Sequence, residues 1–231
     1  MSMVPFRRTE RRRKRRPLDQ AQVVRAALDL LDEVGLDELT MRRLAERLGI
    51  KAASLYRHVR NKDELLALLG DEISSEIPYA SASGTWQEQL TGMAWNVRRG
   101  LLAHRDAARV LANSPPVGPR RLRHVEDVLR VLRASGLRDR DAARAGYHLN
   151  NFVTEFAADE ARFAAYASAP GFSRRKLLAE ARKQFASLPK SDYPTIVALA
   201  DHLTEDAQDE LFQFGIEMCL RGIQGLAKRR S

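Results

Sequence analysis

Hydrophobic residues recur at spacings of three and four along most of the chain, which is the pattern of amphipathic α-helices. A first helix is predicted over residues 17–34, with Asp19 as its N-cap and Gly35 ending it. The same spacing predicts four long helices further on, at 86–104, 120–135, 139–166 and 205–228. No segment shows the two-residue alternation of a β-strand. The sequence therefore predicts an all-α fold, with a three-helix head followed by a larger helical body.

Two short helical patterns meet at Gly49, within residues 40–62. Thr40 is placed to cap the first of them, and the second is predicted over residues 51–59. Each has apolar residues on one side only, and the rest of the stretch holds seven basic residues and one acid, Glu46. Two helices joined by a tight turn, with one apolar and one cationic side, form a helix-turn-helix. A cationic helix face that fits a major groove indicates DNA as the partner.

Basic charge is concentrated in two places. The chain has a formal net charge of +9 and a pI of about 10.1, and residues 1–16 alone contribute +7. Residues 40–62 contribute +6, whereas the remainder of residues 17–77 is strongly acidic. This distribution favours a polyanion bound at defined positions. For residues 1–16 two compatible interpretations remain open, a disordered soluble tail and an arm that contacts phosphates or a minor groove.

Several classes of function find no support in the sequence. Cys219 is the only cysteine, so neither an internal disulfide nor a cysteine-based metal site is expected. No apolar run of about 18 residues is present, and no apolar segment follows the basic N-terminus, so we expect a cytoplasmic protein without a membrane span. There is no glycine-rich phosphate loop and no recognisable nucleophile–base pair. We therefore expect no enzyme activity, no cofactor and no bound metal.

Three segments of the first third of the chain carry a specific resemblance. The sequences VVRAALDLLDEVGLDELT, RRLAERLGI and SLYRHVRNKDELL resemble the DNA-binding domain of the tetracycline-repressor (TetR) family, and residues 85–87, 98–110 and 211–226 resemble the body of its tetracycline-binding members. The resemblance implies an all-α homodimer whose body binds a small molecule and whose head then leaves its operator. It divides the chain into a basic arm at 1–16, a head at 17–62, a connecting helix at 63–78 and a body at 79–231.

The resemblance also implies which residues contact DNA. Arg42 matches a position that reaches a base and is our first choice for guanine readout. Tyr56 and Lys62 match phosphate contacts. Ala52 and Ala53 depart from the tetracycline repressors, which have Gln and Pro there, and an alanine can touch only a thymine methyl. The full predicted DNA-binding set is Thr40, Met41, Arg42, Lys51, Ala52, Ala53, Ser54, Tyr56, Arg57, His58 and Lys62.

In the body, the polar anchors for tetracycline–magnesium are replaced. The matching positions are Pro78, Met93, Val97, Leu111, Ser114 and Pro115. We therefore predict a different effector, less polar than tetracycline–magnesium, held against an apolar wall. The helix at 139–166 offers polar candidates, although His148 and Asn151 are also explained, and more simply, as satisfied groups at a helix interface. The predicted ligand-binding set is Met93, Val97, Leu111, Ser114, Tyr147, His148, Asn151, Phe152 and Glu155.

The last predicted helix has apolar residues on two sides, so it must be covered on two sides. With the helix at 139–166 it fits a four-helix bundle between two subunits. The predicted dimerisation residues are Leu149, Phe156, Leu211, Gly215, Met218, Gly222 and Ile223.

Two functions remain to be compared. The first is a sequence-specific transcriptional regulator, in this family most often a repressor, which binds a palindromic double-stranded operator as a homodimer and is released by an apolar effector. The alternative is an architectural protein that binds DNA through charge alone and has no effector.

Overall fold

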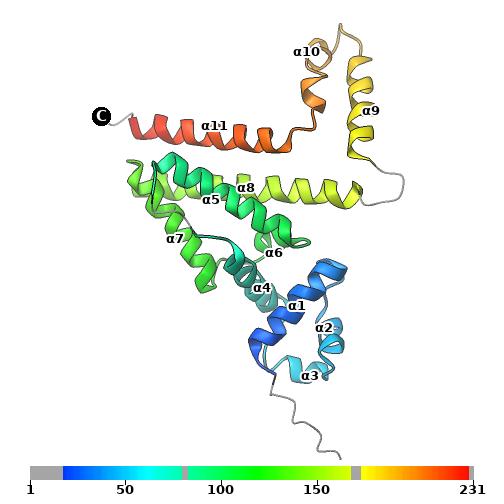
Figure 1. Ribbon diagram of the computed structural model, residues 1–231, viewed down its shortest axis with the longest axis vertical. Coiled ribbons are helices and arrows are strands. Elements are labelled where there is room, and N and C mark those ends of the chain that lie inside the picture. Colours follow the sequence, from blue (N-terminus) through cyan, green and yellow to red (C-terminus); the bar gives the residue numbers. More distant parts are fainter. Residues whose placement is uncertain (1–17, 80–82, 168–172, 229–231) are drawn as a thin grey trace, which may run out of the picture.

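The computed structural model describes residues 18–79, 83–167 and 173–228, and these residues fold into helices joined by turns and loops (Figure 1). The predicted all-α class is confirmed. The predicted arm at 1–16 lies outside the described residues. The helices are α1 Gln20–Val34, α2 Met41–Leu48, α3 Ala52–Leu55, α4 Lys62–Glu76, α5 Trp86–Ala103, α6 Ala107–Ala112, α7 Pro119–Ala134, α8 Asp139–Ala167, α9 Arg174–Ala186, α10 Pro194–Ala198 and α11 Gln208–Lys228, with a short 3₁₀ turn, η1, at His202–Thr204.

The head helices begin at the caps that the sequence predicts. The Asp19 carboxylate accepts a hydrogen bond from the Gln22 amide at 2.7 Å, and the Gln22 side chain returns one to the Asp19 amide. Thr40 Oγ1 caps α2 by accepting from the Arg43 amide at 3.2 Å, and Asn61 caps α4 by accepting from the Glu64 amide at 2.8 Å. These bonds satisfy amides that the helices leave without partners, and so they fix where each helix begins.

The third helix is shorter than predicted. The pattern predicted a helix over residues 51–59, but α3 covers only Ala52–Leu55. After it the backbone tightens, because the amides of Arg57 and His58 bond to the carbonyls three residues back, at 3.4 and 2.9 Å. Gly49 adopts a left-handed conformation with φ of 65°, which makes the tight turn between α2 and α3. The helix-turn-helix is therefore present with a compact second helix.

Helix α7 also differs from its predicted bounds and inner face. It begins at Pro119, which occupies the first helical position, where its missing N–H costs nothing. The spacing of apolar residues predicts a start one residue later, at position 120. Val125, which the spacing puts on the inner side of this helix, is exposed, whereas Val131 and Leu132 are fully buried.

The head does not have a core of its own. One hydrophobic cluster joins Leu31, Leu44 and Leu55 of the head to Leu69 of α4 and Val110 of α6. Because α6 contributes buried side chains to this cluster, the head packs directly on the body as well as being connected through α4. A displacement of α6 would therefore change the packing of the head.

A second hydrophobic cluster fills the body between α5, α7, α8 and α11. Phe212 and Ile216 of α11 are fully buried against Leu90 of α5 and Val153 of α8. Figure 1 shows α8 and α11 lying side by side and running in opposite directions at the end of the molecule away from the head. The two long helices thus form one layer of the body.

Helices α9 and α10 project beyond this layer (Figure 1). No residue of α9 is buried, and the helix contacts α10 and η1. Ion pairs tie it to the segment before α11, from Arg174 to Asp206 at 2.5 Å and from Arg182 to Asp201 at 2.6 Å. None of the helices in the described ranges is long and apolar enough to cross a membrane.

Candidate DNA-binding surface and its connection to the body

The predicted DNA-binding residues lie on α2, α3 and the turns beside them, at the end of the molecule opposite α8 and α11 (Figure 1). The exposed members are Thr40, Arg42, Lys51, Ala52, Ala53, Tyr56 and Arg57. Met41, Ser54, His58 and Lys62 are partly exposed. Leu55 is the buried residue that anchors α3 to the core, so the short helix presents its other sides outward.

Arg42 is a highly accessible cation of this surface. Its side chain is 88% exposed, and its Nε donates to Glu46 one helical turn later at 2.9 Å. An exposed pair of this kind is worth little, so the guanidinium can exchange its carboxylate for a base or phosphate at small cost. Gln20 secures the neighbouring turn, because its Nε2 donates to the His58 carbonyl at 2.9 Å.

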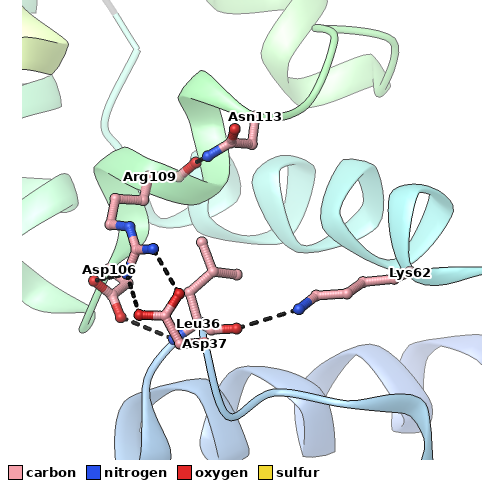
Figure 2. Close-up of polar contacts among 6 residues, drawn as sticks. All are labelled: Leu36, Asp37, Lys62, Asp106, Arg109 and Asn113. Carbon is pink, nitrogen blue, oxygen red and sulfur yellow. Dashed lines mark hydrogen bonds and ion pairs between the residues drawn. The ribbon is translucent and has the colours of Figure 1, made fainter.

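Lys62 differs from the other members of the set. Its ammonium donates to the Leu36 carbonyl at 3.3 Å and so points into the loop between α1 and α2 (Figure 2). To contact a phosphate, as the resemblance implies, Lys62 would have to release this bond.

Three charged side chains and one backbone amide connect that loop to the body (Figure 2). We call this cluster the α6 latch, and it consists of Asp37, Asp106, Arg109 and the amide of Leu36. Asp106 has φ of 58°, a conformation uncommon for a residue with a side chain, and its Oδ2 accepts from the Leu36 amide at 2.8 Å. Arg109 binds Asp37 with two nitrogens, at 3.1 and 2.7 Å. The hydrogen bonds from Arg109 lower the pKa of Asp37. The start of α6 is thus connected to the α1–α2 loop by a bidentate ion pair between Arg109 and Asp37, and by a hydrogen bond from the Leu36 amide to Asp106.

His104, two residues before Asp106, makes a second connection. Its Nδ1 lies 2.9 Å from Asp32 of α1 and its Nε2 lies 3.0 Å from Glu76 of α4. The Arg105 amide also donates to Asp32, at 2.9 Å. Burial lowers the pKa of His104, but the hydrogen bonds to the two carboxylates outweigh it and leave the pKa above its ordinary value. A protonated His104 therefore bridges the head, the connecting helix and the body.

This bridge predicts a pH-dependent contribution to stability. Since the folded pKa of His104 is raised above the unfolded one, its contribution is complete below the unfolded pKa, about 6.5, and is lost as pH rises through the folded pKa. We expect His104→Gln to lower the free energy of unfolding clearly at pH 6 and less at pH 9. Urea unfolding of both proteins at equal concentration measures the two differences. A difference that does not change between the two pH values would contradict the charged bridge.

The predicted ligand-binding residues do not come together in one place. Val97 and Leu111 pack against the head cluster, and Ser114 is buried, with its Oγ donating to the Val110 carbonyl at 2.7 Å. Phe152 stacks on Phe212 in the body core, with ring centroids 5.7 Å apart. The remaining members on α8 are exposed or partly exposed, and they are Tyr147, His148, Asn151 and Glu155.

Met93, a member of the predicted set, borders a cavity. The cavity has a volume of about 580 Å³ and lies between α5 and the segment that joins α4 to α5, with Tyr79, Gln89, Gly92 and Asn96 also lining it. The sequence pattern did not predict this site. The signal for it was present in α5, where Gln89, Gly92 and Asn96 recur at spacings of three and four among apolar residues.

The predicted dimerisation residues divide into two groups. Leu211, Met218 and Gly222 lie on an exposed side of α11, and Phe156 is partly buried. Leu149, Gly215 and Ile223 were expected at a subunit interface but are buried within the protomer's own core. The physical reason is close packing inside the chain, because a Cβ at Gly215 would come within 2.2 Å of the Phe152 ring. These three positions are therefore corrected from interface to core.

The α6 latch and the His104 bridge were also missed by sequence reasoning. Their signal was the run HRDAAR at 104–109, which places three charged residues and a histidine between two apolar helices. Among the described residues, no group of three or more His, Cys, Asp or Glu side chains is arranged to hold a metal ion.

Comparison with known families gives two matches that together cover nearly all the described chain. Residues 23–69 match the family model of bacterial regulatory proteins of the tetR family, and residues 77–227 match the tetracyclin repressor-like C-terminal domain. Among curated proteins, the class A tetracycline repressor protein from transposon 1721 of Escherichia coli is 35% identical over 213 residues, covering 90% of each chain. The HTH-type transcriptional repressor DrrR1 of Streptomyces coeruleorubidus is 31% identical, covering 96% of this chain and 84% of its own.

A solved structure agrees over the same length. ActR, a TetR family protein of Streptomyces coelicolor crystallised in complex with actinorhodin, is 37% identical and superposes with a TM-score of 0.83, covering 92% of this chain and 99% of its own. The match includes both the helix-turn-helix head and the helical body described above. The chain belongs to the tetracycline-repressor (TetR) family of transcriptional regulators.

Proposed function

We propose that this regulator represses transcription by binding a palindromic double-stranded operator as a homodimer, and that an effector other than tetracycline–magnesium releases it. The observation that supports this proposal best is the exposed surface of α2 and α3, held on a core that continues into α6. A body that shares a core with the head can transmit a change in its own conformation to the DNA-binding surface. We divide the chain as the sequence predicts, into an arm at 1–16, a head at 17–62, a connecting helix at 63–78 and a body at 79–231.

The dimer is supported by the outer side of α11, which we call the α11 stripe: Leu211, Phe214, Met218, Gly222 and Gly225. The three larger residues are exposed, and nothing lies within 4 Å of a Cβ added to either glycine. An apolar stripe on a long helix in the outer layer suits the same stripe of a second copy. Two heads related by a two-fold axis would then meet successive major grooves, roughly 34–36 Å apart.

In this proposal, base-sequence specificity comes from Arg42 and from the short apolar surface of α3. Arg42 reads guanine in this proposal, and Ala52 and Ala53 contact thymine methyl groups. Tyr56 contacts a phosphate through its hydroxyl. The remaining predicted residues position the head on the backbone.

The proposal is tested by a gel shift on the DNA upstream of the protein's own coding region. We expect the wild type to bind this fragment at physiological salt, and Arg42→Ala to weaken binding by about 1–3 kcal/mol, which is roughly tenfold to a hundredfold. Arg175→Ala serves as the matched control, because Arg175 is an exposed arginine of α9, far from the head (Figure 1).

Unrelated DNA of the same length separates this proposal from the architectural alternative. If Arg42→Ala weakens binding to both DNAs equally, Arg42 contributes charge and not readout. If the wild type shows no preference for either DNA, and salt abolishes both complexes alike, the architectural protein is the correct function.

The effector is proposed to be less polar than tetracycline–magnesium and the protein to release it unchanged. The class A relative is named a tetracycline repressor, and ActR was crystallised with actinorhodin, so relatives of this length accept different ligands. In this chain the positions that match the tetracycline anchors hold residues of lower polarity, of which Leu111 and Val97 pack into a core. The regulator acts in the cytoplasm in this proposal, where its operator lies.

A further inference from the structure

The cavity beside Tyr79 lies on the side of α5 that faces the end of α4. We call it the Tyr79 cavity, and the side chains that the argument uses are Tyr79, Glu88, Gln89, Gly92, Met93 and Asn96. It includes Met93, one of the positions that the family resemblance implies, whereas Val97, Leu111 and Ser114 are packed or hydrogen-bonded elsewhere. A volume of about 580 Å³ falls within the range of sites that hold small molecules.

The shape of the cavity depends on Gly92. A Cβ added at this glycine would meet no atom of the described residues within 4 Å, so the α5 backbone itself forms an open floor. Gln89 and Asn96 lie one turn before and one turn after it on the same face. A flat ligand can therefore lie along the helix without displacing a side chain.

One polar atom in the wall lacks a partner. Gln89 Nε2 donates to the Gly84 carbonyl at 3.0 Å, whereas Gln89 Oε1 is shielded from solvent and accepts no hydrogen bond in the part of the chain that the structure describes. A shielded acceptor without a donor is unfavourable and uncommon in native proteins. A ligand that brings a hydroxyl or N–H group beside Gln89 would satisfy it.

The aromatic wall is held in place from behind. The Tyr79 ring stacks on His124 of α7, with centroids 4.7 Å apart, and His124 Nε2 donates to the Ser74 carbonyl of α4 at 3.0 Å. Tyr79 is half exposed, so part of its ring remains available for contact. Aromatic rings favour offset or edge contacts with other rings, which selects an aromatic ligand here.

Charge excludes one class of ligand. Glu88 is the one charged side chain among the described residues that line the cavity, and its carboxylate accepts a hydrogen bond from the Thr85 amide at 2.7 Å. Arg99 bonds to Asn96 Oδ1 at 2.6 Å, but Arg99 does not itself line the cavity. A carboxylate or sulfonate would face Glu88 with no cation in the wall, whereas an uncharged hydroxyl would not be repelled.

We propose that the Tyr79 cavity binds the effector, and that the effector is an uncharged planar aromatic molecule carrying a hydroxyl group that donates to Gln89. This inference rests on the proposed function, because it names the ligand class of that regulator. Occupation acts on the DNA-binding head through α4, since Tyr79 and Pro78 follow its last turn and Asn96 Nδ2 donates to the Pro78 carbonyl at 3.4 Å. The ligand shifts the head only by its preference for the conformation that does not bind DNA.

The test uses 2-naphthol as the probe, with naphthalene lacking the donor and 2-naphthoate carrying a negative charge as comparison compounds. Fluorescence titration of the full chain is expected to show saturable binding of 2-naphthol and at least tenfold weaker binding of 2-naphthoate. The leucine side chain of Gly92→Leu would occupy the cavity, and this variant should bind 2-naphthol at least tenfold more weakly. Gln89→Leu should lower the affinity for 2-naphthol about tenfold, because one hydrogen bond is lost, and it should leave the affinity for naphthalene unchanged.

Thr91→Leu is the matched control, because it adds the same side chain one position earlier on α5, outside the cavity lining. It should leave the affinity for 2-naphthol unchanged. Absence of saturable 2-naphthol binding, or binding that survives Gly92→Leu, overturns the assignment of the site. Gel shifts of the same preparations keep the two proposals apart, since a wild type that fails to bind its upstream DNA overturns the proposed function, whereas the probe titration addresses the cavity alone.

Discussion

Replacing Arg98 by alanine is expected to lower the free energy of unfolding by about 3–5 kcal/mol, the usual cost of leaving a shielded ion pair without one partner. Arg98 of α5 is 3% exposed and reaches two other helices of the body. It binds Glu160 of α8 with two nitrogens at 2.8 and 2.9 Å, and Asp209 of α11 at 2.7 Å. Its guanidinium also lies 4.9 Å from the ring centroids of Trp95 and Phe212. The single side chain therefore connects α5, α8 and α11.

Burial lowers the pKa of Arg98, but its hydrogen bonds to the two carboxylates outweigh this and leave the pKa above its ordinary value, so the charge persists inside the body. Arg99→Ala is the control, because the neighbouring arginine is exposed and should contribute within about 0.5 kcal/mol. Urea unfolding at one protein concentration compares the variants, since stability of a dimer depends on concentration. Equal losses for Arg98→Ala and Arg99→Ala would contradict the stabilising role of the network.

Placing two carboxylates on the α11 stripe is expected to produce a monomer that binds the operator at least about a hundredfold more weakly. Phe214 and Met218 are 60% and 58% exposed in the protomer, so Phe214→Glu/Met218→Glu changes side chains that lie mostly outside the internal packing. In a two-fold dimer the four carboxylates would be buried against one another. Separate heads then lose the advantage of two linked half-sites, which is commonly 10²–10⁴ in affinity.

Light scattering gives the mass of the variant, and the gel shift gives its affinity for the operator. Gln224→Glu is the matched control, because it adds a carboxylate at an exposed position of the same helix outside the stripe. A double variant that remains dimeric would show that the α11 stripe is not the interface. Helical content, measured by circular dichroism, confirms that any loss of binding does not come from unfolding.

Local signals in the sequence were sufficient for much of the fold. Asp19 and Thr40 cap their helices as predicted, because capping depends on one side chain and an amide three residues away. The length of α3 was not predictable in the same way. The spacing of Leu55 and Val59 is compatible both with a continuous helix and with the tighter turn that the backbone forms.

Contacts between distant segments account for most of the remaining errors. Gly215 has the spacing of an interface residue, and only the position of Phe152 shows that it faces inward. Likewise, periodicity alone could not tell which side of α5 borders a cavity, since Met93 and Val97 are both apolar. The partners of Lys62 and Arg109 were missed because they belong to a loop 26 and 72 residues away in the sequence.

The α6 latch affects whether the head and the body of this regulator can be exchanged independently with those of a relative. A chimaera that joins the head of one relative to the body of another is usually designed by choosing a junction in the connecting helix. Here such a junction would also divide Asp37 from Arg109 and Asp32 from His104, although neither pair lies near the cut. A transplanted head keeps its connection to this body only if it brings acidic residues at both positions. Compatibility between heads and bodies is thus encoded by a few charges in the α1–α2 region, independently of the residues that read DNA or bind the effector.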